Sequence, residues 1–231
     1  MNRTLLLAGI ATTLFAFNAN ATEWNPYVSA KLTNSKIDVD GSQMTGPEYR
    51  EATIKDKNNY GFNAAVGAST AVPYGSVRGE FEFGYKHGMK DNYTDAEGVA
   101  NGATSILKAD IETYMFNMYY DIDTGTKLTP YVGAGFGLAH IDAKSSYDHP
   151  NVAYSRVNAS DTKFAWQLSA GAAYALTDNL AIDLGYRYTD LGSIKGNSNF
   201  MDAQTGAVAA PLNMKADFET HEIMLGARYT F

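Results

Sequence analysis

The stretch Val77-Arg78-Gly79-Glu80-Phe81-Glu82-Phe83-Gly84-Tyr85-Lys86 decides the fold class of this chain. Apart from Gly79, every second residue from Val77 to Tyr85 is apolar, and charged residues or glycine occupy the positions between them. Successive side chains of a β-strand point to opposite faces of the sheet, so this period of two predicts a strand with one apolar and one charged face. Such a strand separates an apolar environment from a polar one.

The same alternation recurs along the rest of the chain. The segment from Ile111 to Asp121 is apolar on both sides, so its sequence does not show which side chains point into the barrel. The connections after the second, fourth and sixth segments are short, whereas the others are long, polar and rich in Gly, Asn and Asp. Short periplasmic turns and long external loops are typical of an outer-membrane barrel. The eight predicted strands are 24–32, 60–69, 77–86, 111–121, 131–141, 164–175, 180–189 and 220–231.

The period of two does not say whether the apolar face points inward, as in a soluble eight-stranded barrel such as a lipocalin, or outward to lipid. Tyrosines near the ends of the apolar faces favour lipid, because aromatic residues gather at membrane interfaces. Glycines on the polar face also favour lipid, since a narrow barrel interior needs small residues. These glycines are Gly61, Gly67, Gly133, Gly135, Gly137, Gly171, Gly185 and Gly226.

The charges on the polar face are equal in number, four basic and four acidic. Charges in water need no such parity, whereas charges enclosed in a barrel must pair or cost several kcal/mol each. We therefore predict a polar plug in place of an open pore, because eight strands leave room only for filling side chains. The predicted interior network consists of Arg78, Glu80, Glu82, Lys86, Asp183, Arg187, Glu222 and Arg228.

The N-terminal residues 1–21 are expected to be a secretory signal peptide. Arg3 forms the charged region, the apolar run from Leu5 to Phe17 is too short to span a bilayer as a helix, and Ala19-Asn20-Ala21 supplies the cleavage site. Residues 22–231 then form one domain, an all-β, eight-stranded, antiparallel up-and-down transmembrane barrel. In this barrel the last strand pairs with the first, and Tyr229 and Phe231 are the predicted C-terminal signal for the barrel-assembly machinery.

Composition restricts the function classes. The net charge of −7 argues against a nucleic-acid partner, and the absence of cysteine rules out disulfides and thiolate metal sites. The chain combines 16 Tyr and 11 Phe with a mean hydropathy of −0.27. Aromatic girdles on a barrel with hydrophilic loops account for both facts, although a Tyr-rich soluble β-protein has them too.

Four segments of the chain resemble a known family. The segments 131–137, 175–180, 183–188 and 227–231 are similar to the small outer-membrane β-barrels of the opacity-protein and OmpA-like transmembrane class. The resemblance covers essentially the whole mature chain and implies the barrel fold. It implies less about function, since that class includes adhesins, immune-evasion proteins and structural barrels that differ in their loops.

No catalytic or metal-ligating pattern emerges from the sequence, and we expect no enzyme and no cofactor. The four histidines, His87, His140, His149 and His221, lack metal-ligand spacing. A lipid-modifying hydrolase would need a Ser–His–acid set, but the neighbouring residues His221 and Glu222 point to opposite faces of a strand. The segment 121–125 is similar to a calcium loop but lacks the later bidentate Glu, so a hairpin turn is expected.

The long loops are the expected functional region. Residues 33–59 are rich in charge, and residues 192–217 contain small and apolar residues. We expect a non-enzymatic surface protein of a Gram-negative outer membrane, with both mature termini in the periplasm. Its partners would be membrane lipid, lipopolysaccharide and a host or envelope ligand. The alternatives are a small-solute porin-like channel, an envelope structural barrel and, with least support, a lipid-modifying enzyme.

Overall fold

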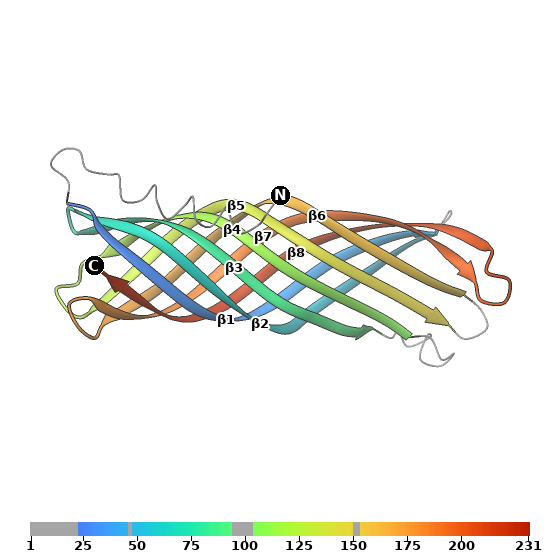
Figure 1. Ribbon diagram of the computed structural model, residues 1–231, viewed down its shortest axis with the longest axis horizontal. Coiled ribbons are helices and arrows are strands. Elements are labelled where there is room, and N and C mark those ends of the chain that lie inside the picture. The colour runs from blue at the N-terminus through green and yellow to red at the C-terminus, as the bar shows by residue number, and fades with distance from the viewer. Residues whose placement is uncertain (1–22, 46–47, 94–103, 150–152) are drawn as a thin grey trace.

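A computed structural model describes residues 23–45, 48–93, 104–149 and 153–231, so the expected signal peptide lies outside the described residues. These residues form an antiparallel all-β barrel in which each strand pairs with the next one in the chain (Figure 1). No helix in this part of the chain is long and apolar enough to cross a membrane. The predicted all-β antiparallel barrel class is confirmed. The strands are β1 (Asn25–Thr45), β2 (Glu48–Val72), β3 (Gly75–Tyr93), β4 (Thr104–Ile122), β5 (Leu128–His149), β6 (Ala153–Ala175), β7 (Leu180–Asp202) and β8 (Val208–Thr230).

Pairing of the first strand with the last closes the barrel. The β1–β8 ladder runs from Tyr27 opposite Thr230 to Thr45 opposite Leu212. Just beyond it, the N–H of Phe231 donates to the carbonyl of Pro26 at 3.0 Å. Closure leaves no strand edge in the hydrocarbon, where an unpaired main-chain group costs several kcal/mol.

The short connections lie together at one end of the barrel, which we call the turn end. They join β2 to β3, β4 to β5 and β6 to β7, in the order predicted. Tyr74 and Gly125 adopt positive φ angles of 67° and 66° in two of these turns. The N–H of Asp123 donates to the carbonyl of Tyr74, which ties these two turns together. The end of β8 lies at the same end (Figure 1), and the opposite end is the distal end.

The strands are much longer than predicted, from 19 to 25 residues. The expected loop 33–59 is mostly strand, because β1 continues to Thr45 and β2 begins at Glu48; likewise β7 and β8 take up most of the expected loop 192–217. The prediction of long loops was therefore wrong for these segments. A membrane-spanning strand needs only about 9–11 residues, so roughly half of each strand extends beyond the bilayer.

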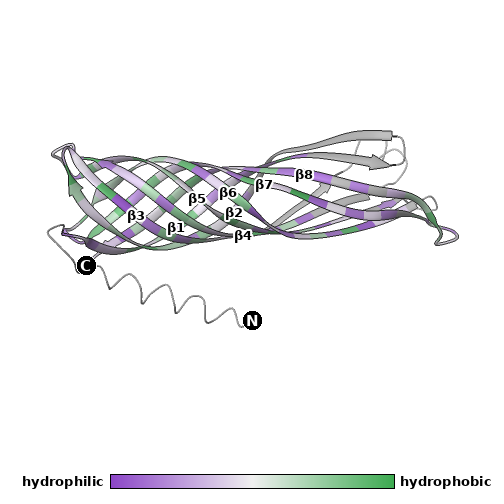
Figure 2. Cartoon of the chain, turned by 90° about the horizontal axis from the view of Figure 1, so that it is seen from above, coloured by the Kyte–Doolittle hydropathy of each residue, from purple (hydrophilic) through white to green (hydrophobic). Residues whose placement is uncertain are grey.

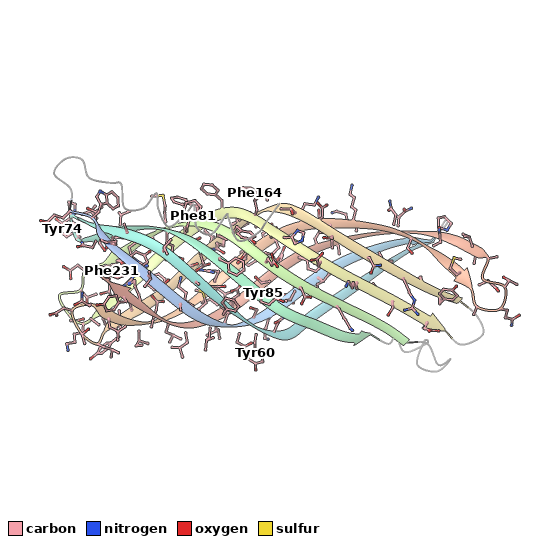
Figure 3. All side chains as sticks on the ribbon, in the orientation of Figure 1. Tyr60, Tyr74, Phe81, Tyr85, Phe164 and Phe231 are labelled. Atoms are coloured by element: carbon pink, nitrogen blue, oxygen red, sulfur yellow. The ribbon has the colours of Figure 1, made fainter. Side chains whose placement is uncertain are left out.

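The outer face of the turn half is an apolar belt. Along β1, Val28, Ala30 and Leu32 point outward and are exposed. Outward aromatic rings also pack from strand to strand, with 5.4 Å between the ring centroids of Phe81 and Phe116. Figure 3 shows outward-pointing aromatic residues from the turn end to the middle of the barrel, so the apolar face points outward, as the lipid-facing interpretation requires. The labelled residues are Tyr60, Tyr74, Phe81, Tyr85, Phe164 and Phe231.

The polarity of the two faces inverts half-way along the barrel. On β1 the inward residues change from Lys31 and Ser35 to Ile37 and Val39, while outward Leu32 gives way to polar residues. Figure 2 shows the underlying alternation of hydrophobic and hydrophilic residues. The turn half is therefore polar inside, and the distal half is apolar inside. We call this buried apolar set the distal core: Ile37, Val39, Ala109, Ile111, Met115, Ala139, Ile141, Ala143, Ala165, Leu191, Ile194 and Phe218.

The distal half is divided into two sheets. The β2–β3 ladder extends distally only to Gly61 opposite Lys86. The β6–β7 ladder is interrupted beyond Trp166 and resumes only at the distal tip, where Tyr154 lies opposite Met201. Strands β7, β8, β1 and β2 remain paired in one sheet, and β3 to β6 in the other. Both sheets contribute to the distal core, which therefore holds them together like the core of a β-sandwich.

The distal core predicts a large stability effect at Phe218, which is 1 % exposed. Phe218→Ala should lower the free energy of unfolding by about 3–5 kcal/mol, because it removes a buried ring and leaves a cavity. The measurement is urea unfolding of the barrel refolded in lipid vesicles. The exposed neighbour Glu219 provides the control, since Glu219→Ala should shift the midpoint little. Equal midpoints for the two variants would contradict the buried core.

Candidate functional site: the charged interior and the distal end

The interior of the turn half is organised around the carboxylate of Glu82. The guanidinium of Arg187 donates to it through two nitrogens, with Nη1–Oε1 at 2.6 Å and Nη2–Oε2 at 3.1 Å. Lys31 Nζ lies 3.0 Å from the same carboxylate and 3.1 Å from Glu80 Oε1. All four side chains are buried, so two cations and two anions neutralise each other inside the barrel.

Neutral side chains complete the hydrogen bonds of this cluster. The hydroxyls of Tyr27 and Tyr119 donate to Glu80 at 2.9 Å and 3.1 Å. Asn117 donates to Glu80 at 3.3 Å, and its own side-chain oxygen accepts from Gln167 at 2.6 Å. A buried carboxylate needs such donors, because a charge removed from water is stable only when it is paired and hydrogen-bonded.

A second ion pair lies near the distal core. Lys86 Nζ is 2.9 Å from Glu222 Oε1, which also accepts a hydrogen bond from the hydroxyl of Thr220 at 3.0 Å. Glu222 is fully buried, and the next inward residue of β8 toward the distal end after Thr220 is Phe218 of the distal core. The pair thus marks the level at which the interior changes from polar to apolar.

A third charged group lies nearer the turn end. Arg78 Nε donates to Asp121 Oδ2 at 2.7 Å, and Arg228 Nη1 lies 3.7 Å from the same oxygen. The guanidinium of Arg78 also lies 4.5 Å from the centre of the Tyr119 ring, where a cation–π interaction adds to the ion pair. Asp183 accepts a hydrogen bond of 2.6 Å from the hydroxyl of Tyr131.

The eight residues predicted for the interior network all lie on the inward face, and the structure adds Lys31 and Asp121. Lys31 lies on the polar side of the first predicted strand but was not included in the predicted network. Asp121 was expected to end the fourth strand and begin a hairpin turn, and its inward position on β4 was not predicted. With both included, the inward charges of the turn half are five basic and five acidic, so the enclosed charge remains balanced.

Glycines make room for the large polar side chains inside the barrel. A Cβ atom on Gly133, Gly135 or Gly137 of β5 would overlap the neighbouring side chains of Tyr119, Asn117 and Met115 on β4. These positions also settle the facing of β4, whose inward residues are Met115, Asn117 and Tyr119. The glycines therefore allow side chains from β4 to fill the interior, where Tyr119 and Asn117 belong to the polar plug of the turn half and Met115 belongs to the distal core.

The histidines with described side chains lie on the outer surface. His140 Nδ1 is 2.9 Å from the Thr162 hydroxyl, and His221 Nδ1 is 2.6 Å from the Tyr186 hydroxyl. The side chains of His87 and His149 are outside the described part. Among the described residues no group of three His, Cys, Asp or Glu side chains could hold a metal ion.

The segment that is similar to a calcium loop is divided between two roles. Asp121 points inward to Arg78, while Asp123 Oδ1 accepts the N–H of Gly125 at 2.8 Å within the turn. The two carboxylates therefore do not converge on one site.

The distal connection between β7 and β8 is an ordered turn, residues 202–208, which we call the β7–β8 tip. Asp202 Oδ1 accepts hydrogen bonds from the N–H groups of Thr205 at 2.7 Å and Gln204 at 3.0 Å. These hydrogen bonds, that of Thr205 above all, hold the pKa of Asp202 below its usual value. Gly206 adopts a φ of 67°, and Val208 is 58 % exposed. The tip is thus a preformed turn that presents an apolar side chain.

Comparison with known proteins matches residues 4–231 to the outer membrane protein beta-barrel domain. The chain belongs to this family. It is 30 % identical over 221 residues to the outer membrane protein PagN of Salmonella typhimurium, covering 89 % of each chain. Membership places the protein in the outer membrane of a Gram-negative bacterium.

Solved structures resemble the fold at low sequence identity. The outer membrane protease OmpT from Escherichia coli aligns with a TM-score of 0.59 and 8 % identity, over 93 % of this chain and 99 % of that one. The attachment invasion locus protein Ail of Yersinia pestis aligns with a TM-score of 0.45 and 16 % identity, over 90 % and 99 % of the two chains.

The central ion pair predicts a strong effect of single substitutions. Arg187→Ala should lower the free energy of unfolding by about 3–5 kcal/mol, because Glu82 loses its bidentate partner while it stays buried. Lys215→Ala is the control, since it removes a cation from the exposed pair with Asp217 and should leave the unfolding midpoint unchanged. A wild-type midpoint for Arg187→Ala would mean that the pair is not enclosed.

The filled interior also predicts the behaviour of the barrel in planar lipid bilayers. The polar plug and the distal core occupy successive levels of the same barrel, so the purified protein should show no stable, large conductance. The same preparation should migrate faster on a denaturing gel before boiling than after it, which controls for correct folding. A large steady current from folded protein would contradict the plug.

Proposed function

We propose that the protein is a non-enzymatic surface adhesin, an eight-stranded barrel whose distal half stands outside the cell and contacts a host or envelope ligand. The turn end then faces the periplasm, as do both mature termini. This orientation follows the rule that outer-membrane barrels have short turns on the periplasmic side. Tyr229 and Phe231, at the turn end, would serve as the signal read by the assembly machinery.

The observation that carries the proposal is the two-sheet distal half with its own core. A barrel that only anchored or sealed the membrane would need strands of about 9–11 residues, whereas these have 19–25. The distal core stabilises the strand residues that extend beyond the bilayer. The distal half is therefore a rigid scaffold and not a set of flexible loops. Rigid scaffolds commonly carry binding sites on the connections that they hold in place.

The β7–β8 tip supports contact with a partner. Its turn is ordered by Asp202, and Val208 and Pro211 are exposed beside it. A preformed turn loses little conformational entropy on binding, which favours affinity. The outer surface nearer the bilayer carries Lys36, His221 and Tyr188, whose polar groups are suited to lipopolysaccharide around the barrel.

The alternative functions have less support. A small-solute channel has to pass both the polar plug and the distal core. A lipid-modifying enzyme would need a nucleophile beside His221, where the structure has the hydroxyl of Tyr186. An envelope structural barrel remains the strongest alternative, and the following experiment separates it from adhesion.

Each distal hairpin can be shortened at a ladder pair, so that the remaining strands keep their register. The shortened forms join Ile37 to Lys57, Lys86 to Ile111, Ile141 to Asp161 and Ser193 to Asp217 through an Asn-Gly turn. Cells that display the full barrel should bind to epithelial monolayers, and cells that display the barrel with all four hairpins shortened should not.

The control for this experiment is heat-modifiable migration, which must be retained by the shortened barrel. Val208→Lys, a single change at the tip, tests the tip alone in the full barrel. Equal adhesion of the full and shortened forms contradicts the adhesin. If neither form adheres and only deletion of the whole barrel sensitises cells to detergent, the structural alternative is correct.

A further inference from the structure

The barrel wall contains a gap in its ladder between β6 and β7, beyond the apolar belt. No ladder pairs join residues 155–165 of β6 to residues 191–200 of β7, and we call this region the β6–β7 seam. On its other edge β6 is paired with β5 along this whole stretch, and β7 is paired with β8 from Ser193 onward. The seam therefore consists of two facing strand edges whose main-chain donors and acceptors lack ladder partners.

A bulge in β7 accounts for the gap. The β7–β8 register shifts between Asp190 and Ser193, and Gly192 within this stretch has a φ of 76°. The N–H of Gly192 accordingly leaves the ladder and donates to Asp190 Oδ1 at 2.8 Å. Leu191 points into the distal core with no exposed surface. Leu191 keeps the alternation of the inward residues Arg187 and Thr189, and the bulge after it moves the inward positions to Ile194 and Gly196, so the strand beyond it leaves the register with β6.

Side-chain exposure shows that the wall is open to solvent at the seam. Asp161 and Lys163 are inward positions of β6, since they lie opposite Ile141 and Ala139 of β5, which are both fully buried. Nevertheless their side chains are 43 % and 36 % exposed, and they form an ion pair with Lys163 Nζ 2.6 Å from Asp161 Oδ2. The β5–β6 ladder is continuous beside these positions, so the gap between β6 and β7 gives solvent a route to them.

Contacts other than ladder pairs hold the seam closed, and at its turn side a Cβ on Gly192 would lie 3.2 Å from the Cβ of Lys163 and from the carbonyl oxygen of Phe164. The hydroxyl of Ser198 donates to the carbonyl of Arg156 at 2.6 Å. Gly196 lies next to β6, where an added Cβ would be 2.8 Å from a methyl of Val157 and 3.5 Å from the Cβ of Ala159. These contacts replace a ladder of main-chain hydrogen bonds, so separating the two edges costs less here than where a ladder joins neighbouring strands.

We infer that the β6–β7 seam is a binding site for an extended peptide segment of a partner protein, which is added to the wall as a strand. The inference rests on the proposed adhesive function and names the chemistry of the partner. Unpaired strand edges recognise another strand through main-chain hydrogen bonds, and strands are commonly about five or six residues long. The eleven residues of the β6 edge exceed that length.

The seam is better suited to a peptide than to an acyl chain of a lipid. An acyl chain offers no donors or acceptors to the two edges, and apart from its last two residues on β6, Phe164 and Ala165, the seam lies on the distal side of the apolar belt. The Asp161–Lys163 pair can exchange partners with a charged residue of the peptide. Val157 and Ile194, which are buried behind the edges, can contact its apolar side chains.

A disulfide across the seam provides the test. Ala159→Cys and Gly196→Cys would bring two Cβ atoms to about 3.5 Å, within the range of a disulfide, and the natural chain has no other cysteine. Val157→Ala is included to remove the methyl that lies too close to residue 196. Oxidation then locks the seam and dithiothreitol opens it, so one protein is both the sample and its matched control. Unchanged heat-modifiable migration shows that both states are folded.

The probe is a displayed library of random decapeptides, selected on the refolded wild-type barrel in detergent. The selected peptides are synthesised, and their affinities are measured for the oxidised and reduced protein. We expect binding to the oxidised form to be at least about tenfold weaker, which corresponds to about 1.4 kcal/mol. N-methylation of the peptide backbone should weaken binding at each residue that lies between the two edges, because alternate N–H groups of an inserted strand face β6 and β7.

Equal affinity for the two states would overturn the inference, and so would binding that is insensitive to N-methylation. Spin-labelled stearate that binds only the reduced form would identify an acyl chain as the occupant. Concentration-dependent dimers that disappear on oxidation would identify a second copy; either result also overturns the inference. On cells, adhesion that is absent in both states contradicts the proposed function, whereas equal adhesion in both states contradicts only the strand site.

Discussion

Lipid cannot hydrogen-bond to the main chain, and most of this structure follows from that constraint. A sheet in the bilayer must close on itself, which the β1–β8 ladder achieves. Closure with strands of alternating polarity places the polar residues in a narrow interior, where each charge needs a partner within hydrogen-bonding distance. The bidentate contact of Arg187 with Glu82, shared with Lys31, meets that need at the centre of the barrel. The plug is thus a consequence of closure, and it explains why the balance of charges is visible in the sequence.

The same strands continue into water, where the constraint is reversed. Beyond the bilayer the outward residues have to be polar and the inward residues can form an ordinary hydrophobic core. Ile37 and Phe218 point inward, as Lys31 and Glu222 do nearer the turn end. The difference is that the barrel wall is surrounded by water at the level of Ile37 and Phe218 and by lipid nearer the turn end. With a core of its own, the distal half no longer depends on a continuous ladder. It can divide into two sheets, and the β6–β7 seam is one result of that division.

Much of the fold could be predicted from period two, because lipid on one side and a packed interior on the other make the alternation strong. The turn-half strands, their order of short connections and the inward position of Arg78, Glu82 and Arg187 follow from that pattern. The distal strand halves could not be recognised in the same way. Residues 33–45 and 192–202 contain polar, charged and small residues among the apolar ones, a composition that is typical of loops. Polar and apolar residues still alternate there, but the apolar residues now point inward, as in the change from Ser35 to Val39. This change of face was the sequence signal that could have identified the distal strand halves. The bulge at Gly192 shifts the inward positions from Leu191 to Ile194, and the alternation of the preceding residues does not predict it.

Site-directed spin labelling along the outward face of β1 tests the inversion of polarity most directly, because the chain has no cysteine to interfere. Single cysteines at Val28, Leu32, Lys36 and Asp40 would carry the label, and collision rates would be measured with oxygen, which partitions into lipid, and with a water-soluble nickel chelate. The account predicts that oxygen dominates at positions 28 and 32 and that the nickel chelate dominates at positions 36 and 40. Oxygen dominance at all four positions, or nickel access at positions 28 and 32, would contradict it.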